Sequence, residues 1–242
     1  MTDQEIETSP RTLARVGGAL YLLIIAIGLF GEGFVRNRIV VPGDATATAA
    51  NLRSMESLWR FGIAAELALL IATVALSLIL YVLLRPVCRK LAALAVFFNL
   101  MTVAVEAVAG LCLAAALFPL GKAESLKAFE PAQLDVLATL AIRLHGYGFG
   151  IALIFFGCEC LIVGHLIVRS GYLPKTIGVL MQIAGLCYLT NSFALILSPT
   201  FASQIFPAIL IPAFLGESAL CLWLLTKGVN VERWKLRAAR PS

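Results

Sequence analysis

Residues 136–168, VLATLAIRLHGYGFGIALIFFGCECLIVGHLIV, form an apolar stretch that is more than long enough to cross a membrane. A helix crosses the hydrocarbon core of a bilayer with about 20 residues. Backbone groups in lipid must form their hydrogen bonds within the segment, because no water is available to them. The stretch therefore predicts a membrane-spanning helix that tilts or projects from the bilayer.

Five similar stretches lie on either side of it, at residues 13–31, 61–84, 91–118, 176–197 and 205–226. Each is continuously apolar rather than alternating, which favours helices over a β-barrel. The predicted fold class is all-α: a polytopic membrane protein with six transmembrane helices in one bundle. We expect a single membrane domain over residues 1–242, in which residues 227–242 form a basic tail.

The composition supports the membrane class, and the placement of the cations argues against nucleic-acid binding. Hydrophobic residues make up 60% of the chain and charged residues 14%, whereas a soluble domain is usually about one quarter charged. The net charge of +5 does not indicate nucleic-acid binding, because the cations mark the short loops between apolar stretches. Anionic lipid headgroups explain cations in those positions. We therefore expect membrane lipids as partners, with a small-molecule or lipid ligand as a further possibility, and no nucleic acid; the sequence does not identify a protein partner.

The distribution of Lys and Arg predicts the orientation. Leaving out Arg143, which lies well within an apolar stretch, twelve of these residues lie on the side that carries both termini and six lie on the other side. Cations favour the cytoplasmic side, so both termini are predicted to be cytoplasmic. The first apolar stretch exceeds the roughly 7–15 residues of a signal-peptide core, so we expect an uncleaved span.

Two predicted outer loops carry local signals for short helices. Asp44 follows a Pro-Gly turn in VPGDATATAANLRSMESLW and is a suitable helix N-cap. In GKAESLKAFEPAQLD, we expect a helical turn before Pro131, which suits the first turn of the following span.

Polar side chains interrupt the apolar stretches. A charge at mid-bilayer costs about 2.5–3.5 kcal/mol on insertion scales, so several of them imply a shielded interior. Two groups repeat at helical spacing and predict polar faces: Glu66, Thr73 and Ser77, and then Asn99, Thr102 and Glu106. Hydrogen bonding between helices is the structural explanation for the Ser, Thr and Asn residues, but a carboxylate needs a cation, a donor or a proton.

The stretch 136–168 has polar or small residues on two faces. Gly146, Gly150, Gly157 and Gly164 share one face with Arg143 and begin with a GxxxG spacing, which predicts close helix packing. His145 and Glu159 lie nearly opposite. We expect this helix to be central, with Arg143 paired to Glu66 or Glu106 and His145 in the same cluster. The alternative is that Arg143 extends to lipid headgroups.

These side chains predict a polar pocket within the membrane. Its expected lining consists of Glu32, Glu66, Glu106, Arg143, His145, Asn191 and Glu217. Carboxylates outnumber cations there, so either some are protonated or a cation occupies the pocket. No metal, cofactor or catalytic residue is predicted. The chain has only two histidines, and Cys158 and Cys160 point about 200° apart on a helix.

The motifs LHGYGFGIALIFFGCECLIVGHLIVRSGYLPKTIGVLMQIAGLCYLTNSF, VPGDATATAANL, LYVLLRPV and LGESALCLWLLTKGV have a recognisable pattern. Over residues 11–230 the chain resembles the bacterial domain-of-unknown-function family 4386. The resemblance implies a six-helix protein of the bacterial cytoplasmic (inner) membrane and supplies no activity. His165 stands where the family pattern leads us to expect an aromatic residue.

Three functions fit these observations. The first is binding or transport of a small molecule, lipid or ion in the polar pocket. The second is an intramembrane enzyme that acts on a lipidic substrate, with a carboxylate or His145 as acid and base. The third is a structural or partner-binding membrane protein, in which the polar cluster only fixes helix packing.

Overall fold

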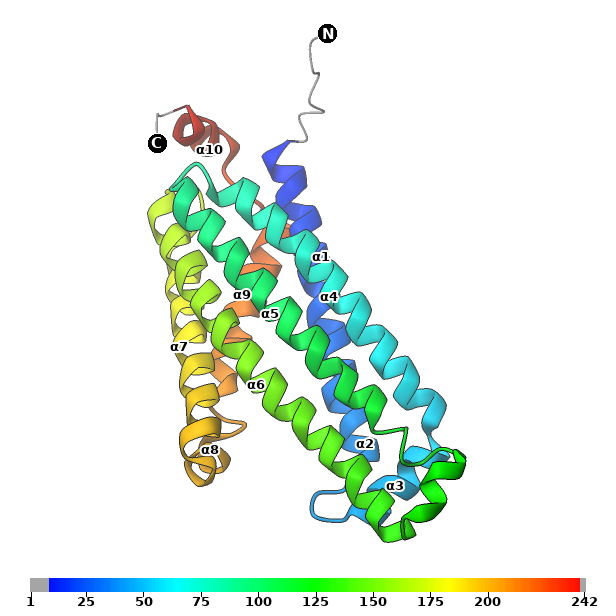
Figure 1. Ribbon diagram of the computed structural model, residues 1–242. Helices are drawn as coiled ribbons and strands as arrows, with labels where there is room; N and C mark the ends of the chain where they lie inside the picture. The colour runs from blue at the N-terminus through cyan, green and yellow to red at the C-terminus, as the bar shows by residue number, and fades with distance from the viewer. Residues whose placement is uncertain (1–8, 240–242) are drawn as a thin grey trace. The chain divides into compact units, whose positions relative to one another are not determined.

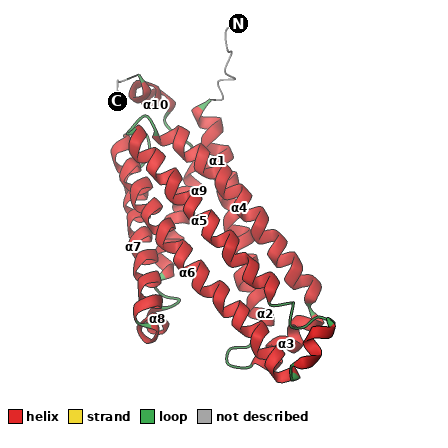
Figure 2. Cartoon of the chain, in the orientation of Figure 1, coloured by secondary structure: helices red, strands yellow, loops and turns green. Residues whose placement is uncertain are grey.

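The computed structural model describes residues 9–239, and every regular element in that range is a helix (Figures 1 and 2). The chain forms two compact units. Within the described residues, unit 1 contains 9–23, 72–102 and 153–239, and unit 2 contains 24–71 and 103–152. Several long helices contribute residues to both units.

Five helical segments are long and apolar enough to cross a membrane. They are Pro10–Ile39, which joins α1 (Pro10–Leu29), η1 (Phe30–Arg36) and α2 (Asn37–Ile39), followed by α4 (Glu56–Leu84), α5 (Arg89–Ala115), α6 (Pro131–Ser170) and α7 (Lys175–Leu197). A sixth candidate is the bent pair α8 (Pro199–Ile205) and α9 (Leu210–Thr226). The all-α multi-span class is thus confirmed, with five or six candidate spans.

The first span is longer than predicted, ending at Ile39 rather than at residue 31. Between α1 and α2 the backbone forms a π-helix, η1, which carries Glu32 and Arg36. Hydropathy falls at these two charged residues, which is why the sequence placed the end of the span before them. The two side chains form an ion pair, with 2.6 Å between Arg36 Nε and Glu32 Oε2. Because each charge is offset by the other, the helix continues through both residues.

The prediction of an unbroken last span at 205–226 is wrong. The axes of α8 and α9 differ by 57°, and four residues separate the helices. Pro207 lies in this break. A proline has no backbone N–H to donate and its ring clashes with the preceding turn, so it interrupts a helix.

Both local predictions for the loops of unit 2 are confirmed. The Asp44 side chain accepts a hydrogen bond of 2.8 Å from the Ala47 backbone nitrogen, which caps α3 (Ala45–Ser54). The second loop contains the 3-10 helix η2 (Glu124–Ala128), and α6 begins at Pro131.

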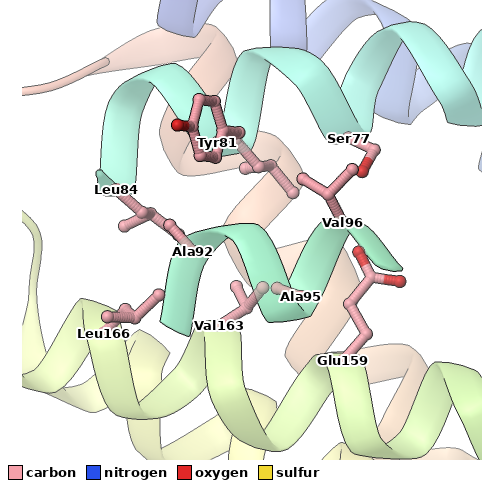
Figure 3. A pocket seen from close by; sticks show the side chains of 10 residues that line it. Ser77, Tyr81, Leu84, Ala92, Ala95, Val96, Glu159, Val163 and Leu166 are labelled. Atoms are coloured by element: carbon pink, nitrogen blue, oxygen red, sulfur yellow. The ribbon is translucent and has the colours of Figure 1, made fainter. Parts of the chain in front are cut away.

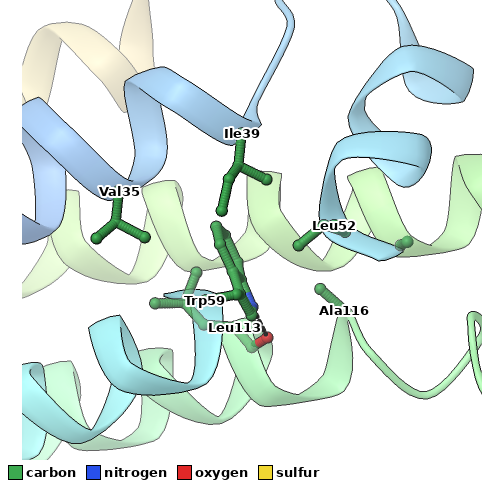
Figure 4. Packing of buried hydrophobic residues seen from close by; sticks show 7 residues of the cluster. Val35, Ile39, Leu52, Trp59, Leu113 and Ala116 are labelled. Carbon is green, nitrogen blue, oxygen red and sulfur yellow. Dashed lines mark hydrogen bonds between the residues drawn. The ribbon is translucent and has the colours of Figure 1, made fainter. Parts of the chain in front are cut away.

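The core of unit 2 surrounds Trp59 (Figure 4). The Trp59 indole Nε1 donates a hydrogen bond of 2.9 Å to the Leu113 carbonyl oxygen, linking α4 to α5. Val35 of η1 and Ile39 of α2 pack against the same buried cluster. This packing fixes the end of the first span, and therefore the direction in which η1 presents its charged side chains.

Close glycine contacts hold α6 against α7 in unit 1. A Cβ at Gly157 would lie 2.9 Å from the Gly185 carbonyl oxygen, and one at Gly164 would lie 2.5 Å from the Gly178 carbonyl oxygen. Only glycine permits this approach of two helix backbones. The predicted small-residue seam is therefore confirmed at Gly157 and Gly164, whereas a Cβ at Gly146 would have no neighbour within 4 Å.

The basic segment after α9 forms α10 (Val231–Ala238) and contacts the end of α4 in unit 1. The Trp234 indole donates a hydrogen bond of 3.0 Å to the Leu83 carbonyl oxygen, and the Tyr172 hydroxyl donates one of 2.6 Å to the same oxygen. Burial raises the pKa of Tyr172 above its ordinary range, so the phenol stays a donor. Arg240 lies outside the described residues.

We expect Gly178→Ala to lower the free energy of unfolding by about 1–3 kcal/mol, the usual cost of overpacking. The added methyl would lie 2.6 Å from the Gly164 carbonyl oxygen and 2.8 Å from the Val168 backbone nitrogen, so the helices must separate. Thermal unfolding in detergent, followed by tryptophan fluorescence, measures the loss. Gly146→Ala is the matched control, and an equal loss in both variants would contradict this packing.

Candidate functional site

Arg36 is the centre of a polar cluster in unit 2. It lies on η1, and its side chain is 18% exposed. Its Nη1 is 2.5 Å from His145 Nε2 of α6 and 3.6 Å from Glu66 Oε2 of α4. Its Nε lies beside Glu32, close enough for an ion pair but not aligned for a hydrogen bond. Three helical segments thus converge on one guanidinium.

The hydrogen bonds of His145 define its tautomer. A guanidinium can only donate, so the lone pair of the neutral ring must be on His145 Nε2, facing Arg36. The other ring nitrogen, Nδ1, then carries the proton and donates to the Ala109 carbonyl oxygen of α5 at 3.2 Å. The residue is only 4% exposed. His145 is therefore a neutral ring held between an arginine and a backbone carbonyl.

Glu66 has one oxygen that the described residues leave unpartnered. Its Oε1 is buried and forms no hydrogen bond with any residue in the range 9–239, and its distance to His145 Nδ1 is 4.0 Å. A Cβ at Gly110 would lie 3.8 Å from this oxygen, so the glycine leaves room beside it. Glu106 of α5 interacts electrostatically with both Glu66 and Arg36. Three carboxyl groups thus share one permanent cation.

The predicted pairing of Arg143 with Glu66 or Glu106 is wrong. Arg143 is exposed and forms no ion pair with any described residue. The reason is its register: residues two apart on a helix point about 200° apart, and His145 faces α5 and Arg36. Arg143 must then face outward. Its exposed position favours the alternative, in which the guanidinium reaches lipid headgroups.

The predicted pocket residues fall into separate groups. Glu32, Glu66, Glu106 and His145 lie around Arg36 in unit 2, and we call these five residues the Arg36 cluster. Glu217 and Asn191 belong to unit 1. The Glu217 carboxylate accepts a hydrogen bond of 3.0 Å from the Tyr21 hydroxyl and another from the Tyr188 hydroxyl. Asn191 is half-buried on α7.

Arg36 is the site residue that the sequence analysis missed. The first span was predicted to end at residue 31, which places Arg36 in the outer loop that follows. A signal was present: Glu32 and Arg36 have the i, i+4 spacing that brings opposite charges together on a helix. Within residues 9–239, no three His, Cys, Asp or Glu residues are arranged to hold a metal ion. The predicted ligand-binding pocket within the membrane stays a prediction.

These features define a multi-pass helical membrane protein with charged groups inside its helical units. The chain belongs to the family described as Domain of unknown function (DUF4386), whose model matches residues 16–228. It is similar to an uncharacterized protein of the archaeon Archaeoglobus fulgidus, with 30% identity over 160 residues, covering 66% of this chain and 79% of that protein. This relative is archaeal, so a bacterial source stays a prediction. No solved structure matches the chain.

Replacing Arg36 should destabilise the protein far more than replacing Arg143. Removing one partner of a buried ion pair costs about 3–5 kcal/mol, and we expect Arg36→Met to show most of that loss, because Glu66 loses its cation. Arg143→Met should stay within about 0.5 kcal/mol of the parent, as for an exposed position. Thermal unfolding in detergent compares the two, and similar losses would contradict the assignment.

Nitrogen-15 spectra of the imidazoles provide a second readout for the same variants. With only two histidines in the chain, a His165→Gln variant assigns both. His145 should show a protonated Nδ1 and an unprotonated Nε2. This pattern should be lost in Arg36→Met and kept in Arg143→Met. A protonated Nε2 in the parent protein would mean that Arg36 does not hold the ring.

Proposed function

We propose that the chain is a membrane protein that binds or transports a small organic cation, and that the Arg36 cluster is the site. The family and its archaeal relative carry no assigned activity, so the proposal rests on the chemistry of the cluster. A charge imbalance, an unpartnered acceptor and an open edge support it.

The charges of the cluster favour a positive ligand. Glu32, Glu66 and Glu106 face one guanidinium, and the hydrogen bonds of His145 keep its ring neutral. With all three acids ionised, the cluster would carry a net charge of −2. Such an excess is unfavourable in an environment of low dielectric constant unless protons or a cation offset it.

The unpartnered oxygen of Glu66 is the observation that carries the proposal. Leaving a buried acceptor without a hydrogen bond costs about 1–3 kcal/mol, and more when the group is charged. A ligand with a positively charged N–H group would supply both the missing donor and the missing charge. Phe30 contacts Phe34 on η1 and Phe61 on α4, the same two segments that carry Arg36 and Glu66. The apolar faces of these rings favour an alkylammonium over a strongly hydrated metal ion.

One edge of the cluster is accessible. The Glu32 side chain is 65% exposed, and a Cβ at either flanking glycine, Gly31 or Gly33, would meet no atom within 4 Å. The opposite end, at His145, is buried. A ligand that enters past Glu32 would therefore exchange the exposed carboxylate of Glu32 for the shielded one of Glu66.

Thermal unfolding in detergent tests the proposal with methylammonium, putrescine, tetramethylammonium and sodium chlorides as probes. We expect at least one organic ammonium to raise the unfolding temperature saturably, since a ligand at a hundred times its Kd stabilises by about 2.7 kcal/mol. Glu66→Gln should abolish the rise. Glu56→Gln should keep it, because Glu56 is an exposed acid on the same helix that pairs with Arg60.

Two results would overturn the proposal. One is the absence of any saturable rise with the organic ammonium salts; the other is a rise that persists in Glu66→Gln. A rise with sodium alone would assign the cluster to a metal cation and exclude the organic class.

We propose that the protein lies in a bacterial cytoplasmic membrane with both termini in the cytoplasm, from the excess of Lys and Arg on that side. Green fluorescent protein fused after residue 239 should then fluoresce in cells, because it folds in the cytoplasm. The control is the same fusion after residue 121, in a predicted outer loop. Fluorescence only from the fusion at 121 would reverse the orientation.

A further inference from the structure

Unit 1 contains a small cavity between α4, α5 and α6 (Figure 3). Its volume is about 10 Å³, which is close to the minimum that one water molecule needs. Most of the lining is apolar: Leu80, Leu84, Ala92, Ala95, Val96, Val163 and Leu166. The polar lining side chains are Ser77, Tyr81 and Glu159.

Glu159 is the acidic side chain of this cavity. It is 5% exposed, and in the described part of the chain it forms no ion pair with a cation. Its Oε2 accepts a hydrogen bond of 2.9 Å from Asn99 Nδ2 of α5. Figure 3 shows the carboxyl group of Glu159 and the hydroxyl of Ser77 directed into the space between the helices. An uncompensated carboxylate in such surroundings is expensive.

Asn99 is the hydrogen-bond partner of Glu159, and the other end of its amide is left without a partner. It is 3% exposed, and its buried Oδ1 has no hydrogen-bond partner among the described residues. The oxygen and nitrogen ends of an amide have nearly the same shape, so their assignment depends on the hydrogen bonds around them. With the amide reversed, a protonated Glu159 could donate its O–H to the Asn99 oxygen, and the buried amide atom without a partner would then be Nδ2. Asn99 can therefore serve as the partner of Glu159 in either protonation state.

We propose that Glu159 is a proton-binding site within unit 1, and that one water molecule in the cavity delivers and removes the proton. The step is a plain proton transfer between hydronium and carboxylate, giving water and carboxylic acid, and needs no other reactant. Ser77 and Glu159 supply the two polar partners that a buried water needs as a minimum (Figure 3). This site lies outside the Arg36 cluster and does not depend on the function proposed for it.

The lining also shows where the cavity lies along the helices. Leu84 is the last residue of α4, and Ala92 lies in the first turn of α5. The cavity therefore lies between Glu159 and the ends of α4 and α5 that are joined by a turn. The space accommodates a single water rather than an organic solute, so a proton is the ligand that fits.

Infrared spectroscopy tests the proposal on the full chain in lipid bilayers. The spectrum of the parent protein minus that of Glu159→Gln should contain the carbonyl stretch of one protonated carboxylic acid. The matched control is Glu232→Gln, an exposed acid on α10, which should leave that band in place. In Asn99→Leu the band should move to higher frequency, because the acid loses its amide partner.

The outcomes separate the possibilities. Loss of a carboxylate stretch instead of an acid band in Glu159→Gln would overturn the proposal. An acid band that sodium chloride removes and choline chloride leaves would assign a sodium site, which also overturns it. If Glu159→Gln does not fold, Asn99→Leu decides the question. An acid band that keeps its frequency in Asn99→Leu would show that the protonated acid is not Glu159, and would overturn the proposal.

Discussion

A guanidinium within the membrane-spanning region is the constraint around which unit 2 is organised. Arginine does not lose its proton in a protein and offers only donors, so its surroundings must supply acceptors and negative charge. Arg36 obtains both from three segments: Glu32 on its own helix, Glu66 on α4 and His145 on α6. The neutral tautomer of His145 and the charge excess of the cluster both follow from this one side chain.

The π-helix η1 is the local feature that makes the convergence possible. A π-helix is wider than an α-helix and is found frequently at functional sites. In η1 it carries Glu32 and Arg36 on the span itself, while Val35 enters the apolar core around Trp59. The core and the charged cluster thus use alternate faces of the same short segment. The buried indole and its hydrogen bond to α5 fix the backbone from which Arg36 extends.

Local features of the sequence predicted much of the fold. Runs of apolar residues located the spans, and Asp44 and Pro131 marked helix starts, because capping depends on a few adjacent residues. The end of the first span was misplaced, since hydropathy ignores the pairing of Glu32 with Arg36. Periodicity placed Arg143 and His145 on different faces but could not say which face meets other helices. That choice depends on the partners of His145, which are distant in sequence.

The two units deal with buried acids in different ways. In unit 2 the acids share a permanent cation, whereas in unit 1 the intramembrane acids meet neutral donors: phenols for Glu217 and an amide for Glu159. A neutral donor stabilises a carboxylate less than a cation does, and it remains a suitable neighbour once the acid is protonated. Gain or loss of a proton at Glu159 therefore leaves no uncompensated partner behind. At Glu66 the same event would leave Arg36 with less negative charge, so that cluster suits the exchange of charged ligands.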